Sequence, residues 1–125
     1  DSMSDVETVQ RERGWRECEY EDGWHSPKIA PCEQRKLSTW CLQGSWPFLP
    51  DPLADTPDGW WEFGQTLKWA HEKGWVWAAE PYIGGDHQVD VFGDDEHIGY
   101  GYGDFRTSII AALAEAVRHE SEAKG

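Results

Sequence analysis

Residues 75–104 constrain the fold of this chain more than any other part of the sequence. They contain three β-prone runs, WVWAAEPYI, HQVDVF and HIGYGYG, separated by the turn signals Gly-Gly-Asp and Gly-Asp-Asp-Glu. Short runs rich in β-branched and aromatic residues, joined by such turns, are typical of antiparallel strands. We therefore expect a three-stranded antiparallel sheet in this stretch.

The first and third runs alternate in different ways. In the first run both sets of alternating side chains are apolar, with Trp75, Trp77 and Ala79 on one face and Val76 and Ala78 on the other. Two apolar faces are typical of a central strand, so we expect this strand to be covered on both sides. In the third run glycines alternate with Ile98, Tyr100 and Tyr102. The glycine face leaves bare backbone, which admits a closely packed helix or a partner.

A helix is expected on each side of this stretch. Thr56-Pro57-Asp58 combines an N-cap residue, a proline at the first helical position and an acid in the first turn. The helix that follows should end near Gly74, and its apolar face comprises Trp60, Phe63, Leu67 and Ala70. Asp104 is an N-cap candidate for a last helix, whose apolar face comprises Phe105, Ile109, Ile110, Leu113, Ala116 and Val117. The pattern predicts an α+β fold, an antiparallel three-stranded sheet flanked by two helices in the order α-β-β-β-α.

The first part of the chain is expected to form a β-rich lobe and a proline-rich wrap. Ser4 and Glu7 have capping-box spacing, which predicts a short helix that ends at Gly14. An Asp-Gly pair at 22–23 lies between two β-prone runs and indicates a hairpin. Residues 36–42 form another β-prone run, and residues 44–59 contain four prolines among apolar groups, which favours an ordered connection over the core. We expect residues 3–56 and 57–125 to form these two parts of one compact domain.

The net charge of −13 limits the partners of the chain. It disfavours direct binding to nucleic acid and to anionic membranes, because both depend on cationic side chains. Basic proteins, cations and neutral molecules remain, and the acidity can also serve solubility alone. Residues 51–105 hold twelve acids and two lysines. We expect a partner-binding acidic face in the sheet region, with a solvated face as the alternative, and its candidate residues are Asp86, Asp90, Asp94, Asp95, Glu96 and Asp104.

Metal, catalytic and ligand signals are weaker. Cys18, His25, Cys32 and Cys41 are possible zinc ligands, but they lie seven, seven and nine residues apart, whereas zinc fingers place pairs two to four residues apart. The GDDEH run lacks the ligand spacing of an EF-hand loop. No nucleophile elbow, metalloprotease helix, P-loop or dinucleotide fingerprint is present, so we expect neither an enzyme nor a cofactor. The nine tryptophans could stack on a planar ligand, although most have core spacing.

Residues 57–117 are similar to a known family. The segments GWWEFGQTLKWAHEKGWVWAAEPY, HQVDVFGDDEHIGYGYGD and SIIAALAEAV combine an aromatic-rich helix ending in Gly-Trp, strands joined by a Gly/acid turn, and an Ala-rich closing helix. This combination resembles the phage ABA sandwich domain of small bacteriophage and prophage proteins. The resemblance implies a phage origin and a helix–sheet–helix sandwich, and it carries over no activity and no catalytic residue. Residues 14–53 fit it loosely, and residues 32–56 depart from it.

The acidic sheet and the resemblance together favour a small acidic phage accessory protein that binds and inhibits a host protein. An anti-CRISPR-like inhibitor of host defence is the sharpest version, because concentrated carboxylates can imitate the phosphates that a basic groove holds. Three cysteines and no signal-peptide pattern indicate a reducing compartment, here the host bacterial cytoplasm. The alternatives are a small-molecule or nucleotide-signal binding protein that stacks its ligand on Trp and Tyr, and a zinc-stabilised structural module.

Overall fold

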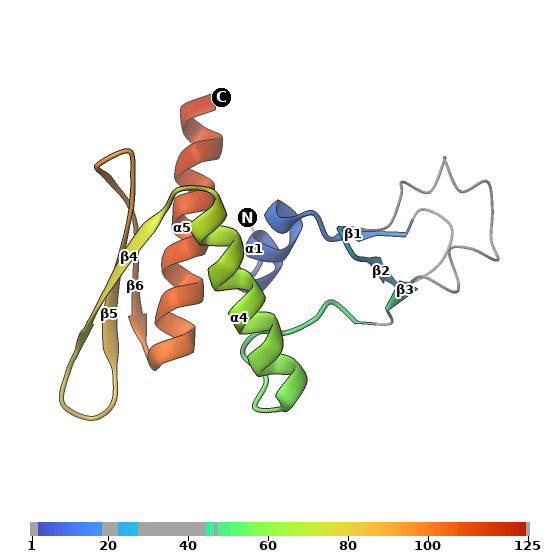
Figure 1. Ribbon diagram of the computed structural model, residues 1–125, viewed down its shortest axis with the longest axis horizontal. Coiled ribbons are helices and arrows are strands. Elements are labelled where there is room, and N and C mark those ends of the chain that lie inside the picture. The colour runs from blue at the N-terminus through green and yellow to red at the C-terminus, as the bar shows by residue number, and fades with distance from the viewer. Residues whose placement is uncertain (1–2, 19–22, 28–44, 47, 125) are drawn as a thin grey trace.

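A computed structural model describes residues 3–18, 23–27, 45–46 and 48–124 of the chain (Figure 1). These residues form an α+β fold, which confirms the predicted fold class. The elements in chain order are α1 (Asp5–Arg13), β1 (Arg16–Glu17), β2 (Trp24–His25), β3 (Ser45–Trp46), α4 (Pro57–Glu72), β4 (Val76–Pro81), β5 (His87–Gly93), β6 (Glu96–Gly103) and α5 (Phe105–Lys124).

The larger sheet has the strand order β4-β5-β6 and is antiparallel throughout. β5 is its central strand, with Val91 paired to Trp77 on one side and to Gly99 on the other. An irregularity between Val91 and Phe92 shifts the register toward the β5–β6 turn. The predicted three-stranded antiparallel sheet and the order helix, three strands, helix are therefore confirmed.

The expectation that the first strand is central and covered on both faces is wrong. β4 is an edge strand of the sheet, and the side chain of Val76 is 65% exposed. Trp75 is buried and Trp77 half-buried on the helical side, whereas Val76 and Ala78 on the other side face solvent. An apolar pattern reports the chemistry of the side chains and not what covers them, because much of any protein surface is itself apolar.

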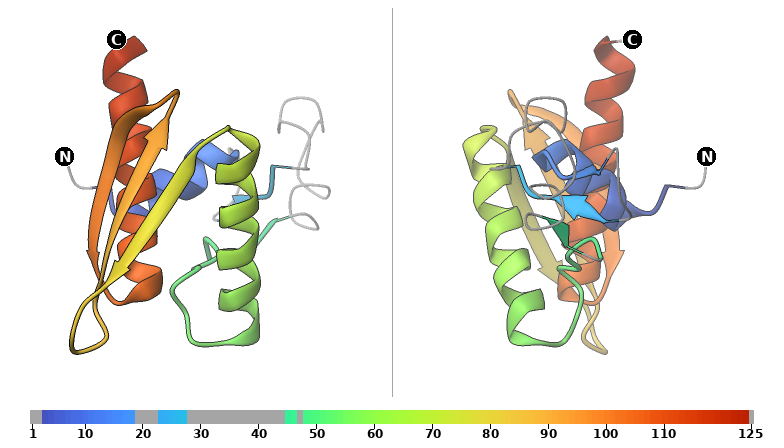
Figure 2. Two further views of the ribbon diagram at one scale, coloured as in Figure 1. Left: turned by 60° about the vertical axis from the view of Figure 1, so that its left-hand side comes forward. Right: turned by 90° about the vertical axis from the view of Figure 1, so that its right-hand side faces the viewer.

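Helix α5 lies along one face of this sheet, and the left view of Figure 2 shows it behind the strands. The approach is close because of the glycines in β6. A Cβ atom on Gly99 would lie 2.2 Å from the carbonyl oxygen of Ala112, and one on Gly101 would lie 2.1 Å from that of Ser108. Of the two occupants expected at the glycine face, the structure has the packed helix.

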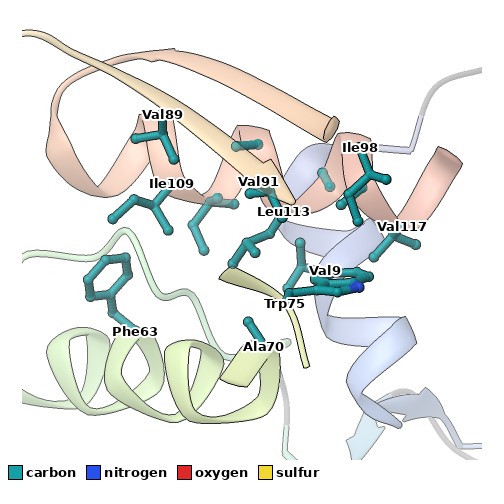
Figure 3. Packing of buried hydrophobic residues seen from close by; sticks show 14 residues of the cluster. Val9, Phe63, Ala70, Trp75, Val89, Val91, Ile98, Ile109, Leu113 and Val117 are labelled. Carbon is teal, nitrogen blue, oxygen red and sulfur yellow. The ribbon is translucent and has the colours of Figure 1, made fainter. Parts of the chain in front are cut away.

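The core lies between the sheet and the helices (Figure 3). Val89 and Val91 of β5 meet Ile109 and Leu113 of α5, and all four side chains are fully buried. Phe63 and Ala70 extend the cluster from α4, Trp75 closes it beside β4, and Val9 joins it from α1. Helix α4 therefore packs on the same face of the sheet as α5. Trp60, expected on the apolar face of α4, is 50% exposed and lies at the rim under Arg106.

The predicted helix starts are confirmed by their hydrogen bonds. The side chains of Ser4, Thr56 and Asp104 accept from the backbone N–H groups of Glu7, Gly59 and Thr107, at 3.1, 3.0 and 2.9 Å. Gly14 and Gly74 follow α1 and α4 with positive φ angles of 111° and 83°. Each cap satisfies backbone groups that a helix end leaves without partners.

The small sheet has the order β1-β2-β3. The antiparallel pairing of β1 and β2 agrees with the predicted pairing of these two runs, while residues 19–22 between them lie outside the described residues, and β2 ends at His25, ahead of Pro27. β3 was not predicted, because residues 44–59 carry four prolines and were interpreted as a connection. The run at 36–42 lies outside the described residues.

Candidate functional site

The larger sheet has one face without a covering layer among the described residues. Val89 and Val91 point toward the helices, so the alternate side chains of β5 point the other way. Figures 1 and 2 show the helices on a single side of β4–β6. We call the other side the open face, and its residues are Val76, Ala78, Glu80, Tyr82, Gln88, Asp90, Phe92, His97, Tyr100 and Tyr102.

Aromatic side chains occupy much of the open face. Tyr102 is 51% exposed and packs its ring against that of Tyr82, with 5.8 Å between the ring centroids. Phe92 and His97 form a second pair at 5.3 Å, and Tyr100 stands between the two pairs on β6. Large, half-exposed rings of this kind provide contact area at a low cost in side-chain entropy.

A row of hydrogen bonds crosses the open face between these rings. The Tyr82 hydroxyl donates to Gln88 Oε1 at 2.8 Å, and Gln88 Nε2 donates to Asp90 Oδ2 at 3.3 Å. Asp90 Oδ1 then lies 2.8 Å from His97 Nε2. The row holds the polar side chains in defined positions, so the face presents an ordered surface before any partner arrives.

The open face carries acids and no lysine or arginine. Residues 74–105 contain no cation of either type, and Glu80 and Asp90 both lie on this face. Loss of hydration and then the nearby Glu80 carboxylate raise the pKa of the Tyr82 hydroxyl. The nearest basic side chains along the chain belong to the helical side, where Lys73 pairs with Glu120 and Arg106 binds the backbone of Pro52 and Ala54.

The structure does not bring the six predicted partner-binding residues together. Only Asp90 lies within the open face, while Asp86 and Asp104 lie at one end of the sheet and the other three lie at the opposite end. The seven residues of β5 lie between Asp86 and Asp94, and the eight steps from one acid to the other span roughly 25 Å at the rise of a β-strand.

Four of these acids have local structural positions or contacts. Asp94 and Asp95 are the two loop residues of the β5–β6 hairpin, and both have positive φ angles, 52° and 65°. This is the geometry of a type I′ turn. Asp104 caps α5, and the hydrogen bond from the Thr107 backbone lowers the pKa of its carboxyl group. Glu96 lies 3.4 Å from His119 on α5.

Sequence reasoning missed most of the open face. Tyr82, Gln88, Phe92, Tyr100 and Tyr102 were not among the predicted site residues. The alternation in each strand was visible, but a regular two-residue turn at Asp94-Asp95 would pair Asp90 with Gly99, and only the irregularity between Val91 and Phe92 places Tyr100 opposite Asp90. The missing information was this irregularity and which face the helices cover.

A concave feature lies between α4 and the small lobe, by which we mean α1 and the sheet β1-β2-β3. It is a cleft of about 370 Å³ with Trp15, Trp61, Pro27 and Pro50 among its walls. Arg13 and Glu62 also line it, and their side chains form a nearly buried ion pair of 2.8 Å. Gln10 connects this ion pair to the segment before α4, because its side-chain amide donates to Glu62 and to the Pro50 carbonyl oxygen.

The metal prediction can be followed only in part. His25 is buried in β2 and Cys18 is partly exposed, whereas Cys32 and Cys41 lie outside the described residues. In the described part of the chain no three His, Cys, Asp or Glu side chains are placed to hold one metal ion.

Comparison with known proteins identifies no relative from which a function could be inferred for this chain. The chain matches no family model, no curated protein and no solved structure. Among the described helices, none has the length and the apolar character needed to span a membrane.

Proposed function

We propose that this protein acts by binding a partner protein that carries a basic surface, and that the open face is its contact surface. The observation that carries the proposal is the composition of that face, which combines exposed tyrosines with Glu80 and Asp90 and has no cation. Tyrosine is enriched at the energetic centres of protein interfaces. Carboxylates around such a centre favour association with a positively charged patch and accelerate the encounter.

The sequence resemblance to phage ABA sandwich proteins points to a host bacterial protein as the partner. A nucleic-acid-handling defence factor fits the charge, because its groove binds phosphates and would accept carboxylates instead. Inhibition then follows from occupancy of the groove, as in an anti-CRISPR protein, and takes place in the host cytoplasm. The protein supplies a surface and no chemistry in this account.

The test is capture of bacterial proteins on immobilised protein and on two charge-reversed variants. The first variant carries Glu80→Lys and Asp90→Lys within the open face. The second carries Asp55→Lys and Glu72→Lys, two exposed acids outside the sheet, and has the same net charge. We expect a partner that the wild type and the second variant retain and the first variant loses. A partner retained equally by both variants would show that the open face is not the contact surface.

The cleft between the small lobe and α4 supports a second candidate function, the binding of a small planar molecule. All hydrogen bonds of Arg13 to described residues use Nη1, so Nε and Nη2 remain for a ligand. In its hydrogen bonds to described residues Glu62 likewise uses Oε2 and not Oε1. A donor and an acceptor in a cleft lined by two tryptophans suit the edge and the ring faces of a nucleobase. Titration of tryptophan fluorescence with guanosine and with adenosine tests this candidate. Saturable quenching that Trp61→Ala removes supports it, and no quenching by either nucleoside contradicts it.

A further inference from the structure

The outer edge of β4 is a second unpartnered feature of the larger sheet. β4 pairs with β5 on one side and with no strand of the described residues on the other. Five of its six side chains are exposed, and only Trp77 is half-buried. The outer edge of β4 is therefore a second exposed surface of the larger sheet, in addition to the open face.

The direction of the backbone groups along β4 follows from two hydrogen bonds. The N–H of Tyr82 donates to the Asp86 carbonyl oxygen across the hairpin at 2.8 Å. In an antiparallel pair such bonds alternate, so the N–H groups of Ala78 and Glu80 also point to β5 and those of Trp77 and Ala79 point outward. The N–H of Trp75, two residues earlier, points outward as well and donates to Ala70 at the end of α4. Trp77 and Ala79 have no backbone partner among the described residues.

This edge lacks the features that usually protect a free edge. Proteins blunt such strands with lysines, bulges, prolines or a covering segment. The sequence of β4 is VWAAEP, with a proline only at the last position and no lysine, and its partner register with β5 is regular. The opposite edge, β6, alternates glycine with larger residues, and glycine gives an added strand no side chain to pack against.

We propose that the partner protein docks in part by adding an extended, basic segment to the sheet as a fourth strand beside β4. This inference rests on the proposed function and specifies how the partner binds. The segment bonds to the outward N–H and C=O groups of Trp77 and Ala79. Its alternate side chains lie on the open face beside Val76, Ala78 and Glu80. Lysine or arginine fits these positions, because the stem covers Val76 and the charged end reaches Glu80 and Asp90.

Charge selects this occupant over a second copy of the chain. Pairing of two β4 strands would join two open faces into one continuous surface. This surface would hold the negative carboxylates of Glu80 and Asp90 from each copy and no lysine or arginine. Each copy also brings a net charge of −13. Like charges across an interface oppose association, whereas a basic segment removes the repulsion.

Amide hydrogen exchange resolved by residue tests the inference, with a blocked decapeptide of alternating lysine and valine as the probe. In the free protein we expect fast exchange at Trp77 and Ala79 and slower exchange at Ala78 and Glu80. Saturating peptide should slow exchange at Trp77 and Ala79 at least about tenfold, because both amides gain hydrogen bonds. A glutamate–valine decapeptide of the same length serves as the charge control and should leave the rates unchanged.

The substitutions Ala79→Pro and Ala79→Val form a matched pair. Proline removes the outward N–H and blocks the edge, and it leaves the bonds to β5 in place because that N–H does not point to β5. We expect Ala79→Pro to lose peptide binding and Ala79→Val to keep it. If Ala79→Pro does not fold, the exchange rates of the wild-type protein decide the question alone.

The possible results separate this inference from the proposed function. Peptide binding that perturbs Tyr100 and Tyr102 but leaves the exchange at Trp77 and Ala79 unchanged overturns the edge inference and leaves the open face as the contact surface. Protection of Trp77 and Ala79 that increases with protein concentration alone shows a second copy on the edge, and it overturns the choice of a basic segment. Absence of peptide binding overturns the inference as well.

Discussion

At the scale of single residues, several acids of the sheet region occupy turn and cap positions of the fold. Asp94 and Asp95 form the two-residue loop between β5 and β6, and their positive φ angles suit glycine or asparagine better than aspartate. Asp104 caps α5. Part of the acidity that the sequence shows therefore belongs to turns and caps, and counting charges along the chain overestimates the size of a contact surface.

Replacing Asp95 by glycine should stabilise the protein. Asp95 has a φ of 65°, which costs energy for a residue with a Cβ atom and little for glycine. We expect Asp95→Gly to raise the free energy of unfolding by about 0.5 kcal/mol and Asp95→Ala to lower it by a similar amount. Urea unfolding of the three proteins measures the difference. Equal effects of glycine and alanine would show that turn geometry does not decide the result.

The cap at Asp104 predicts a dependence on pH. Its folded-state pKa is lowered, so its contribution is present above the pKa of the unfolded chain and is lost as the pH falls through the folded value. Asp104→Ala should cost about 1 kcal/mol of stability at pH 7. The cost should become smaller below pH ~4, the usual range of an aspartate.

Thr56 provides the control for this prediction. Its hydroxyl caps α4 in the same way, with a 3.0 Å bond from the Gly59 N–H, and does not titrate. Thr56→Ala should therefore cost the same amount at acid and neutral pH in chemical denaturation. An Asp104→Ala cost that is equally independent of pH would contradict the role assigned to the charge.

At the scale of elements, the glycines of β6 determine how closely α5 approaches the sheet. A Cβ on Gly101 would be 2.1 Å from the Ser108 carbonyl oxygen, which is a backbone atom and cannot rotate away. Gly101→Ala should lower the free energy of unfolding by about 2 kcal/mol or more. Gly64→Ala is the matched control, since nothing lies within 4 Å of its Cβ position on α4. There we expect a gain of about 1 kcal/mol. Thermal unfolding of both variants shows whether the signs differ.

The secondary structure of residues 57–124 could be predicted from the sequence because local signals agree with one another. Thr56-Pro57, Gly74 and Asp104 mark helix ends, and the turn residues separate the strands. What could not be predicted was coverage. The side chains of Trp75 and Trp77 are largely apolar, as that of Val76 is, yet the indoles lie on the helical side and Val76 faces solvent. That difference depends on where the helices pack, which is a property of tertiary structure.

At the scale of the whole molecule, a nearly buried polar cluster joins the N-terminal helix to α4. Arg13 and Glu62 are 11% and 14% exposed and pair at 2.8 Å, and Thr66 and Gln10 contribute further bonds. Breaking such a pair leaves one charge without compensation. Glu62→Leu should lower the free energy of unfolding by about 3 kcal/mol.

The corresponding double substitution separates charge from packing. If the cost of Glu62→Leu comes from the unpaired guanidinium, Arg13→Leu in the same protein should restore part of the stability. A double-mutant cycle by chemical denaturation measures the coupling. Additive costs would mean that the ion pair does not hold the two parts together.

The candidate site was only partly predictable for the same reason as the fold. Asp90 was singled out because of its charge, and it lies in the open face. Tyr82, Tyr100 and Tyr102 were not, because a tyrosine in a strand is as typical of a core as of a surface. The open face became visible only when the register placed these rings beside Asp90 and the helices occupied the other side of the sheet.

The most direct test of partner binding through the open face is the dissociation constant of the captured partner for three proteins, measured by titration calorimetry. They are the wild type, Tyr100→Ala with Tyr102→Ala, and Trp61→Ala, which removes a more exposed aromatic ring outside the sheet, on α4. We predict that the tyrosine variant binds at least about tenfold more weakly, since buried aromatic anchors carry much of an interface's energy. Trp61→Ala should bind like the wild type. Wild-type affinity in the tyrosine variant, or a loss confined to Trp61→Ala, would contradict the account.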